Sequence, residues 1–164
     1  MKLAGKVAIV TGGGRDIGAA VASKLASEGA RVAINYFSSA AGAEDTVARI
    51  KASGGEAMAL QGDLNTKEDV DALVAQTLAS WGRIDILVNN AGGLIGRKTI
   101  AEMPLEHWEA VMSLNLTSTF LMTQACLAAM TSGSIVNLAS QAGRDGGGPG
   151  AVAYSTAKGA VMTM

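Results

Sequence analysis

Short apolar runs alternate along the chain with longer stretches in which apolar residues recur at helical spacing. The apolar runs predict five strands, over residues 7–11, 31–36, 56–60, 84–89 and 134–139. The helical spacing predicts helices over residues 17–28, 40–52 and 66–80, a long helix from Pro104 to about Met130, and a last helix that begins near Val152. Unbroken apolar strands that alternate with helices are typical of a parallel sheet covered on both faces. With right-handed crossovers, the pattern predicts an α/β fold with a doubly wound parallel sheet, formed by one domain over residues 1–164.

Composition and charge exclude several classes of protein. Hydrophobic residues make up 49% of the chain and charged residues 16%, which excludes a mostly disordered protein. A formal net charge of -1 provides no general basic field, so we expect no nucleic-acid partner. No apolar run approaches the roughly 18 residues of a membrane span, and we expect no membrane partner. The single cysteine, Cys126, excludes an intrachain disulfide and fits a cytoplasmic protein, and with one histidine, His107, we expect no metal site.

A glycine-rich turn, Thr11-Gly12-Gly13-Gly14-Arg15-Asp16-Ile17-Gly18, joins the first predicted strand to the first predicted helix. Glycine lets backbone N–H groups approach a dinucleotide pyrophosphate at a helix N-terminus. The expected contacts come from Gly12, Gly14, Arg15, Ile17 and Gly18. Asp16 adds a carboxylate near the expected phosphates, and we expect it to cap the following helix. A tight strand-to-helix connection without a ligand is the alternative.

Two further strand ends contribute to the same predicted edge of the sheet, where doubly wound folds bind ligands. Asn90, Ala91 and Gly92 follow the fourth strand, where the small residues admit a cofactor and the Asn90 amide can brace neighbouring turns. The second strand ends without a carboxylate over residues 34–39, and Arg15 lies in the glycine-rich turn. Because an acidic residue there would repel a ribose 2′-phosphate, this pattern favours NADP(H) over NAD(H). If Arg15 is only a solvated charge, NAD(H) is the cofactor.

The last predicted helix begins with Tyr154-Ser155-Thr156-Ala157-Lys158, which places a phenol and an ammonium on one helix face. A neighbouring cation favours the phenolate form that a general acid/base must reach. Ser140 ends the fifth strand at the same edge as Asn90, and Asn115 lies in the long helix. Taken singly, each has an ordinary explanation: a surface helix pair, a turn serine, a solvated asparagine.

Together these segments resemble the short-chain dehydrogenase/reductase family of classical type, and 3-oxoacyl-carrier-protein reductases in particular. The resemblance implies a Rossmann-like fold and an oxidoreductase that interconverts a ketone or 3-oxoacyl group and a secondary alcohol with NADP(H). It also implies a small-molecule carbonyl or alcohol substrate and a homo-oligomer, either dimer or tetramer.

The same resemblance assigns roles to individual residues. Tyr154 is the general acid/base, Ser140 hydrogen-bonds the reacting oxygen, and Lys158 favours the phenolate and holds the nicotinamide ribose. Asn115 supports a water-linked proton path. Asp63, with Leu64 after it, lies beside the adenine ring; the alternative is a loop aspartate that accepts hydrogen bonds from nearby backbone groups.

The chain departs from the family pattern in three places. Asp16 stands where most members have glycine, and the interval from Ser140 to Tyr154 is one residue longer than usual, an excess that the loop 146–150 can absorb. Family members continue past Met164 with two further strands and a substrate loop, so we expect a C-terminally truncated chain whose fifth strand is an exposed edge. The alternatives are a non-catalytic nucleotide-binding fragment, an NAD-dependent alcohol or sugar dehydrogenase, and a relative of the sugar-nucleotide epimerases, against which the Asn-Asn-Ala-Gly segment argues.

Overall fold

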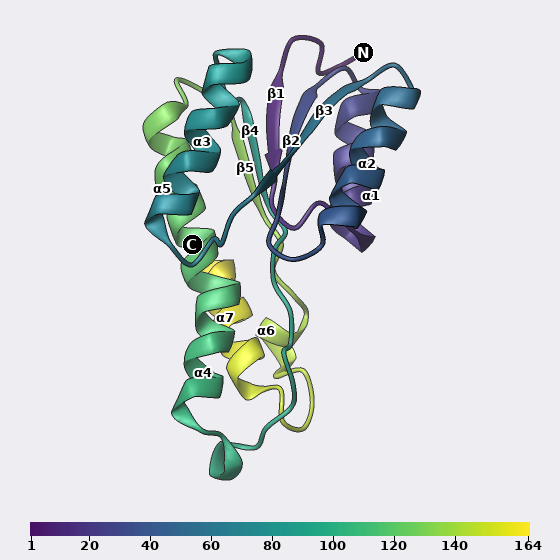
Figure 1. The fold of residues 1–164 in the computed structure, drawn as a ribbon. Helices are drawn as coiled ribbons and strands as arrows, with labels where there is room; N and C mark the ends of the chain where they lie inside the picture. The colour runs from purple at the N-terminus through teal and green to yellow at the C-terminus, as the bar shows by residue number, and fades with distance from the viewer.

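A computed structural model describes residues 1–164 and contains one five-stranded parallel sheet (Figure 1). The strands are β1 (Val7–Val10), β2 (Arg31–Tyr36), β3 (Glu56–Gln61), β4 (Ile86–Asn89) and β5 (Ser134–Asn137). Their order in the sheet is β3-β2-β1-β4-β5, and every neighbouring pair is parallel. The predicted α/β fold with a doubly wound sheet is therefore confirmed.

Helices cover both faces of this sheet. Helices α1 (Asp16–Ser27) and α2 (Ala40–Ala52) lie on one face, and α3 (Lys67–Trp81) and α5 (Ser118–Ala129) lie on the other (Figure 1). Beyond the carboxyl ends of the strands lie α4 (Leu105–Met112), α6 (Ala142–Asp145) and α7 (Val152–Thr163), together with a short 3-10 helix, Ile100–Glu102. None of the helices combines the length and the apolar character that a bilayer crossing requires.

The core has two layers because strand side chains alternate between the two faces. Val10 and Ile34 pack with Ala43 under α1 and α2. Ile9 and Leu87 belong to the other layer, which the buried side chains of α3 and α5 complete. Burial on both faces explains why the strands read as unbroken apolar runs in the sequence.

The prediction of one uninterrupted long helix is wrong in the middle of that helix. The segment from Leu105 to Ala129 contains a π-helical turn, Ser113–Thr117, which separates α4 from α5. Side-chain hydrogen bonds of Asn115 accompany this turn, as described below. The structure also adds α6, which lies inside the loop expected to be irregular.

The sheet has β3 and β5 as its two edges. The side chain of Val136, in the middle of β5, is 49% exposed on a face of the sheet. The order also places a topological switch point between β1 and β4, because the chain leaves these neighbouring strands toward opposite faces. Ligands bind outside the carboxyl ends of strands at such a point.

Candidate active site

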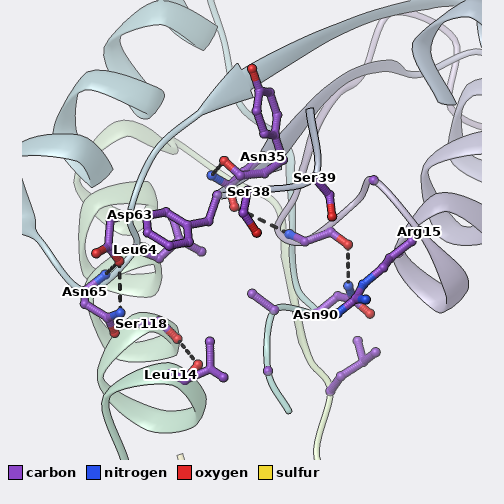
Figure 2. A pocket seen from close by; sticks show the side chains of 18 of the residues that line it. Arg15, Asn35, Ser38, Ser39, Asp63, Leu64, Asn65, Asn90, Leu114 and Ser118 are labelled. Carbon is purple, nitrogen blue, oxygen red and sulfur yellow. Dashed lines mark hydrogen bonds between the residues drawn. The ribbon is translucent and has the colours of Figure 1, made fainter. Parts of the chain in front are cut away.

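A pocket of about 720 Å³ lies at this switch point, beyond the carboxyl ends of β1, β2, β3 and β4. Its size is that of a ligand-binding cleft. Figure 2 shows side chains around it, with Arg15 and Asn90 on one side and Asp63 and Asn65 on the other. The lining includes all the residues that the sequence proposed for cofactor contact: Gly12, Gly14, Arg15, Ile17, Gly18, Asp63, Leu64, Asn90, Ala91, Gly92, Tyr154 and Lys158.

The glycine-rich turn is locked to the end of β4. Asn90 donates from Nδ2 to the carbonyl oxygens of Thr11 at 2.9 Å and Gly12 at 3.1 Å. The Thr11 hydroxyl accepts from the backbone N–H groups of Asn90 and Ala91, both at 3.0 Å. A Cβ at Gly18 would collide with the Gly12 carbonyl and lie 2.5 Å from Asn90 Nδ2. The bracing role expected for Asn90 is thus present, and Gly18 is required by close approach.

Asp16 does not cap α1, so the capping prediction is wrong. Arg15 occupies the N-cap position without a side-chain hydrogen bond, and Asp16 is the first helical residue, at φ +47°. That left-handed backbone turns the Asp16 carboxylate outward, where it is 82% exposed and lies 3.8 Å from Arg15 Nε. Aspartate tolerates this conformation better than most residues, but glycine adopts it without steric cost.

Asn35 is a site residue that the sequence analysis missed. It lies near the end of β2, is 2% exposed, and donates from Nδ2 to the Gly62 carbonyl at 3.1 Å. Its Oδ1 accepts from the Gly12 N–H at 3.4 Å, so one side chain joins the glycine-rich turn to the loop after β3. A polar residue inside an apolar strand was the available signal. Ser38 and Ser39 follow it at the pocket rim (Figure 2).

Asp63 makes hydrogen bonds within its own loop and to the start of α3. Its Oδ1 accepts from the backbone N–H and the Nδ2 of Asn65, both at 2.9 Å, and its own N–H donates to Asp69 Oδ2 at 2.7 Å. These bonds match the alternative of a loop aspartate that serves nearby donors. They also hold Asp63 at the pocket wall, with Leu64 beside it.

Tyr154 and Lys158 lie one helical turn apart on α7 and both line the pocket. Lys158 Nζ lies 5.9 Å from the centroid of the Tyr154 ring and donates to the Leu138 carbonyl at 2.7 Å. The lysine is only 4% exposed, and this burial lowers its pKa. A Cβ at Gly92 would lie 3.1 Å from Lys158 Nζ and 2.7 Å from Asn115 Oδ1, so a larger residue would crowd both groups.

Asn115 and Ser140 do not line the pocket. Asn115 is fully buried behind it, where Oδ1 accepts from the Gly93 N–H and Nδ2 donates to the Gly93 and Val111 carbonyls, each at 2.9 Å. Ser140 is half-buried just after β5, and its hydroxyl accepts from the Ala142 N–H at 3.2 Å. The structure therefore brings Tyr154 and Lys158 to the pocket and places Asn115 against the backbone that forms its wall.

A doubly wound fold with a pocket at the switch point and a Tyr-Lys pair facing it defines a class of nucleotide-binding proteins. Residues 6–164 match the family described as short chain dehydrogenase, and the chain belongs to this family. The resemblance inferred from the motifs is thereby confirmed.

Individual relatives agree with this assignment. The chain is 46% identical to a 3-oxoacyl-[acyl-carrier-protein] reductase of Synechocystis sp., over 98% of this chain and 65% of the relative. It is 37% identical to glucose 1-dehydrogenase 2 of Bacillus subtilis, of which it covers 64%. A short chain dehydrogenase of Burkholderia cenocepacia, solved in complex with NADP, superimposes with a TM-score of 0.94 at 35% identity, over 99% of this chain and 66% of that one. The chain spans between 56% and 65% of the length of these and the other curated relatives compared with it.

Proposed function

We propose that this protein is an NADP(H)-dependent oxidoreductase that interconverts a ketone or 3-oxoacyl group and a secondary alcohol. The observation that carries the proposal is the Tyr154 and Lys158 pair, which faces a pocket built from the glycine-rich turn and the end of β4. The 46% identity to a protein named as a 3-oxoacyl-[acyl-carrier-protein] reductase supports the 3-oxoacyl substrate class. Residues 1–164 would act as one dinucleotide-binding unit within a homo-oligomer.

In this proposal, the Tyr154 hydroxyl donates a proton to the carbonyl oxygen during reduction and takes it back from the alcohol during oxidation. The Lys158 ammonium has three donors, of which Leu138 accepts one, so others are free to hold the ribose and to favour the Tyr154 phenolate. Ser140 is the residue proposed to hydrogen-bond the same substrate oxygen, although its hydroxyl lies outside the pocket lining and accepts from the Ala142 N–H in this structure. Asn115 fixes the backbone of Gly93. The nicotinamide supplies the hydride when it is bound.

The preference for NADP(H) rests on the residues at the adenosine end of the pocket. Arg15, Ser38 and Ser39 line that end, and the segment over residues 34–39 contains no carboxylate. Guanidinium and hydroxyl groups are donors that suit a 2′-phosphate. Arg15→Gln is expected to weaken NADPH binding about tenfold, equivalent to one charge-assisted hydrogen bond, and to leave NADH binding unchanged. Titration with both nucleotides tests this, and tighter NADH binding by the wild type would contradict the preference.

Tyr154→Phe tests the reaction itself. The variant is expected to lose turnover by at least about 100-fold, because general acid–base catalysis contributes on the order of 10² to 10⁴, while its NADPH affinity stays within about twofold. Thr156→Ala, an exposed change on the same helix, is the control and should retain activity. Reduction of a 3-oxoacyl thioester and of simple ketones is followed by the loss of NADPH absorbance. A wild type that binds NADPH but reduces none of these compounds is a nucleotide-binding protein without this activity.

A further inference from the structure

Arg97 joins the segment that follows β4 to the loop that precedes α7. Its Nη1 donates to the Gly147 carbonyl at 3.1 Å and to the Pro149 carbonyl at 2.8 Å. The next residue, Lys98, donates from its backbone N–H to the Gly150 carbonyl at 2.9 Å. Both acceptors of the guanidinium are backbone carbonyls 50 and 52 residues away in the sequence. Arg97 is therefore built to hold a loop in place.

That loop has little conformational preference of its own. Four glycines at positive φ lie within 146–150: Gly146, Gly147, Gly148 and Gly150. Glycine loses more backbone freedom on ordering than any other residue, so four glycines make this loop costly to hold in one conformation. The loop leads directly into α7, whose third residue is Tyr154. The position of the phenol thus depends on contacts from outside the loop.

The other segment that Arg97 holds carries a strained residue. Ile95 has φ +60°, and the Gly96 N–H donates to the Leu94 carbonyl at 2.7 Å, which closes a tight turn around it. A β-branched residue at positive φ is a steric outlier and persists only where its surroundings fix it. The Ile95 side chain is 56% exposed and lines the same pocket as Tyr154. Arg97 directly follows this turn, two residues after Ile95, and its hydrogen bonds hold the turn against the loop 146–150.

We propose that Arg97 is a positioning residue that sets the placement of Tyr154 relative to the pocket wall at Ile95. The inference rests on the proposed function, because it concerns the same tyrosine. Arg97 itself does not line the pocket, so its effect on catalysis passes through the loop 146–150 and α7.

The kinetic experiment compares Arg97→Ala and Arg97→Lys with Arg144→Ala, which removes an exposed arginine of the neighbouring helix α6. The substrate is a small uncharged ketone, so that a charge contact with the substrate does not contribute. Arg97→Ala is expected to lower kcat by about 10- to 100-fold, as a displacement near 1 Å does, with the NADPH affinity unchanged. Arg97→Lys should recover part of kcat, and Arg144→Ala should match the wild type.

A second readout does not need turnover. The chain has two tyrosines, Tyr36 and Tyr154, so fluorotyrosine in a Tyr36→Phe background gives one fluorine NMR resonance that reports on Tyr154. Arg97→Ala is expected to shift or broaden this resonance, and Arg144→Ala to leave it unchanged. An unchanged resonance together with an unchanged kcat in Arg97→Ala overturns the inference. The inference is also overturned if Arg97→Ala only raises KM, and only for a phosphate-bearing thioester, because Arg97 would then bind the charge of that substrate. If the resonance responds but the wild type reduces no ketone, the proposed function fails and the positioning contact stands.

Discussion

At the residue scale, single side chains join parts of the site that are distant in the sequence. Asn90 bonds the glycine-rich turn, Asn35 joins that turn to the loop after β3, and Asn115 holds the backbone of Gly93. The Asn35 and Asn115 amides both donate and accept, whereas the Asn90 amide only donates, so backbone groups of three separate segments around the pocket find side-chain partners. Two charged residues, Asp16 and Lys158, occupy positions that are unfavourable for stability or binding, and each yields a prediction.

Removing the Asp16 charge is expected to strengthen NADPH binding about two- to fivefold at low salt, because a surface charge of this kind contributes up to about 1 kcal/mol. Asp16→Asn keeps a residue that tolerates positive φ, whereas Asp16→Gly also relieves the backbone. If charge is the cause, both variants gain affinity equally, and the gain disappears at high salt. The helix loses a favourable carboxylate at its N-terminus, so stability should fall by about 0.3–1 kcal/mol in Asp16→Asn, whereas relief of the positive-φ backbone opposes this loss in Asp16→Gly. Titrations with NADPH at two ionic strengths measure the effect. Equal NADPH affinities of the wild type and both variants at low salt would refute it.

Lys158→Met is expected to abolish turnover and to remove a pH dependence from the stability of the fold. Burial lowers the pKa of Lys158, so the unfolded chain binds a proton more readily than the native protein does. The native state therefore carries a penalty at pH values below the lowered pKa, and wild-type stability rises with pH between that value and the ordinary value of 10.5. Methionine fills the same space without a charge, but it loses the charge-assisted hydrogen bond to the Leu138 carbonyl, which is worth about 1.5–3 kcal/mol. Thermal unfolding should show the stability of the wild type rising toward pH 10.5 relative to that of the variant; a difference between the two proteins that stays constant with pH contradicts this account.

At the scale of the elements, the sequence predicted what local patterns determine. All five strands and the helices α1, α2, α3 and α7 lie within about two residues of their predicted bounds, because buried strands and capped helices carry local signals. The π-helical turn at Ser113–Thr117 escaped prediction, because it depends on Asn115 meeting Gly93, a tertiary contact. A local signal did exist, namely the hydroxyl residues Ser118 and Thr119. Their side chains donate to the carbonyls four residues back, and hydrogen bonds of this kind bend helices. Asn35 was missed for the same reason, because its partners lie on other loops.

Asn115→Ala tests whether this turn is held by the asparagine. The change leaves the Gly93 N–H and two carbonyls without their partner in a buried place, so the free energy of unfolding should fall by about 2–4 kcal/mol. Thr117→Ala, an exposed change in the same turn, should stay within about 0.5 kcal/mol. Urea unfolding of the three proteins provides the comparison. An Asn115→Ala protein as stable as the Thr117→Ala control would show that the turn does not depend on the amide.

At the scale of the whole molecule, the two ends of the sheet serve different purposes. The carboxyl ends of the strands carry the pocket, whereas the amino ends of β1 and β4 are joined by a buried carboxylate, Asp85. It accepts from Arg83 Nε at 2.8 Å, from the Val7 N–H at 2.9 Å and from Lys6 Nζ at 3.1 Å. Asp85 is 4% exposed, and it lies just before β4 and beside the first residue of β1. Stability can therefore be altered at this end without contact with the site.

The hydrogen bonds of Asp85 predict that the free energy of unfolding falls over a defined range of acidic pH, here called the acid limb. Burial raises the pKa of Asp85, but the hydrogen bonds from Arg83, Val7 and Lys6 outweigh it and lower the pKa from 3.8 to about 2. Because the folded pKa is depressed, the stabilisation is present above the ordinary value and is lost as pH falls toward about 2. It amounts to about 2 kcal/mol.

Asp85→Asn should therefore be less stable by about 2 kcal/mol at neutral pH, and its stability should fall less steeply between pH values near 4 and 2. Asp71→Asn, which breaks only an exposed pair with Lys67, should retain the wild-type acid limb. Because Asp85 is remote from the pocket, NADPH affinity should be equal in all three proteins at neutral pH. If Asp85→Asn keeps the acid limb of the wild type, the acid sensitivity belongs to another carboxylate.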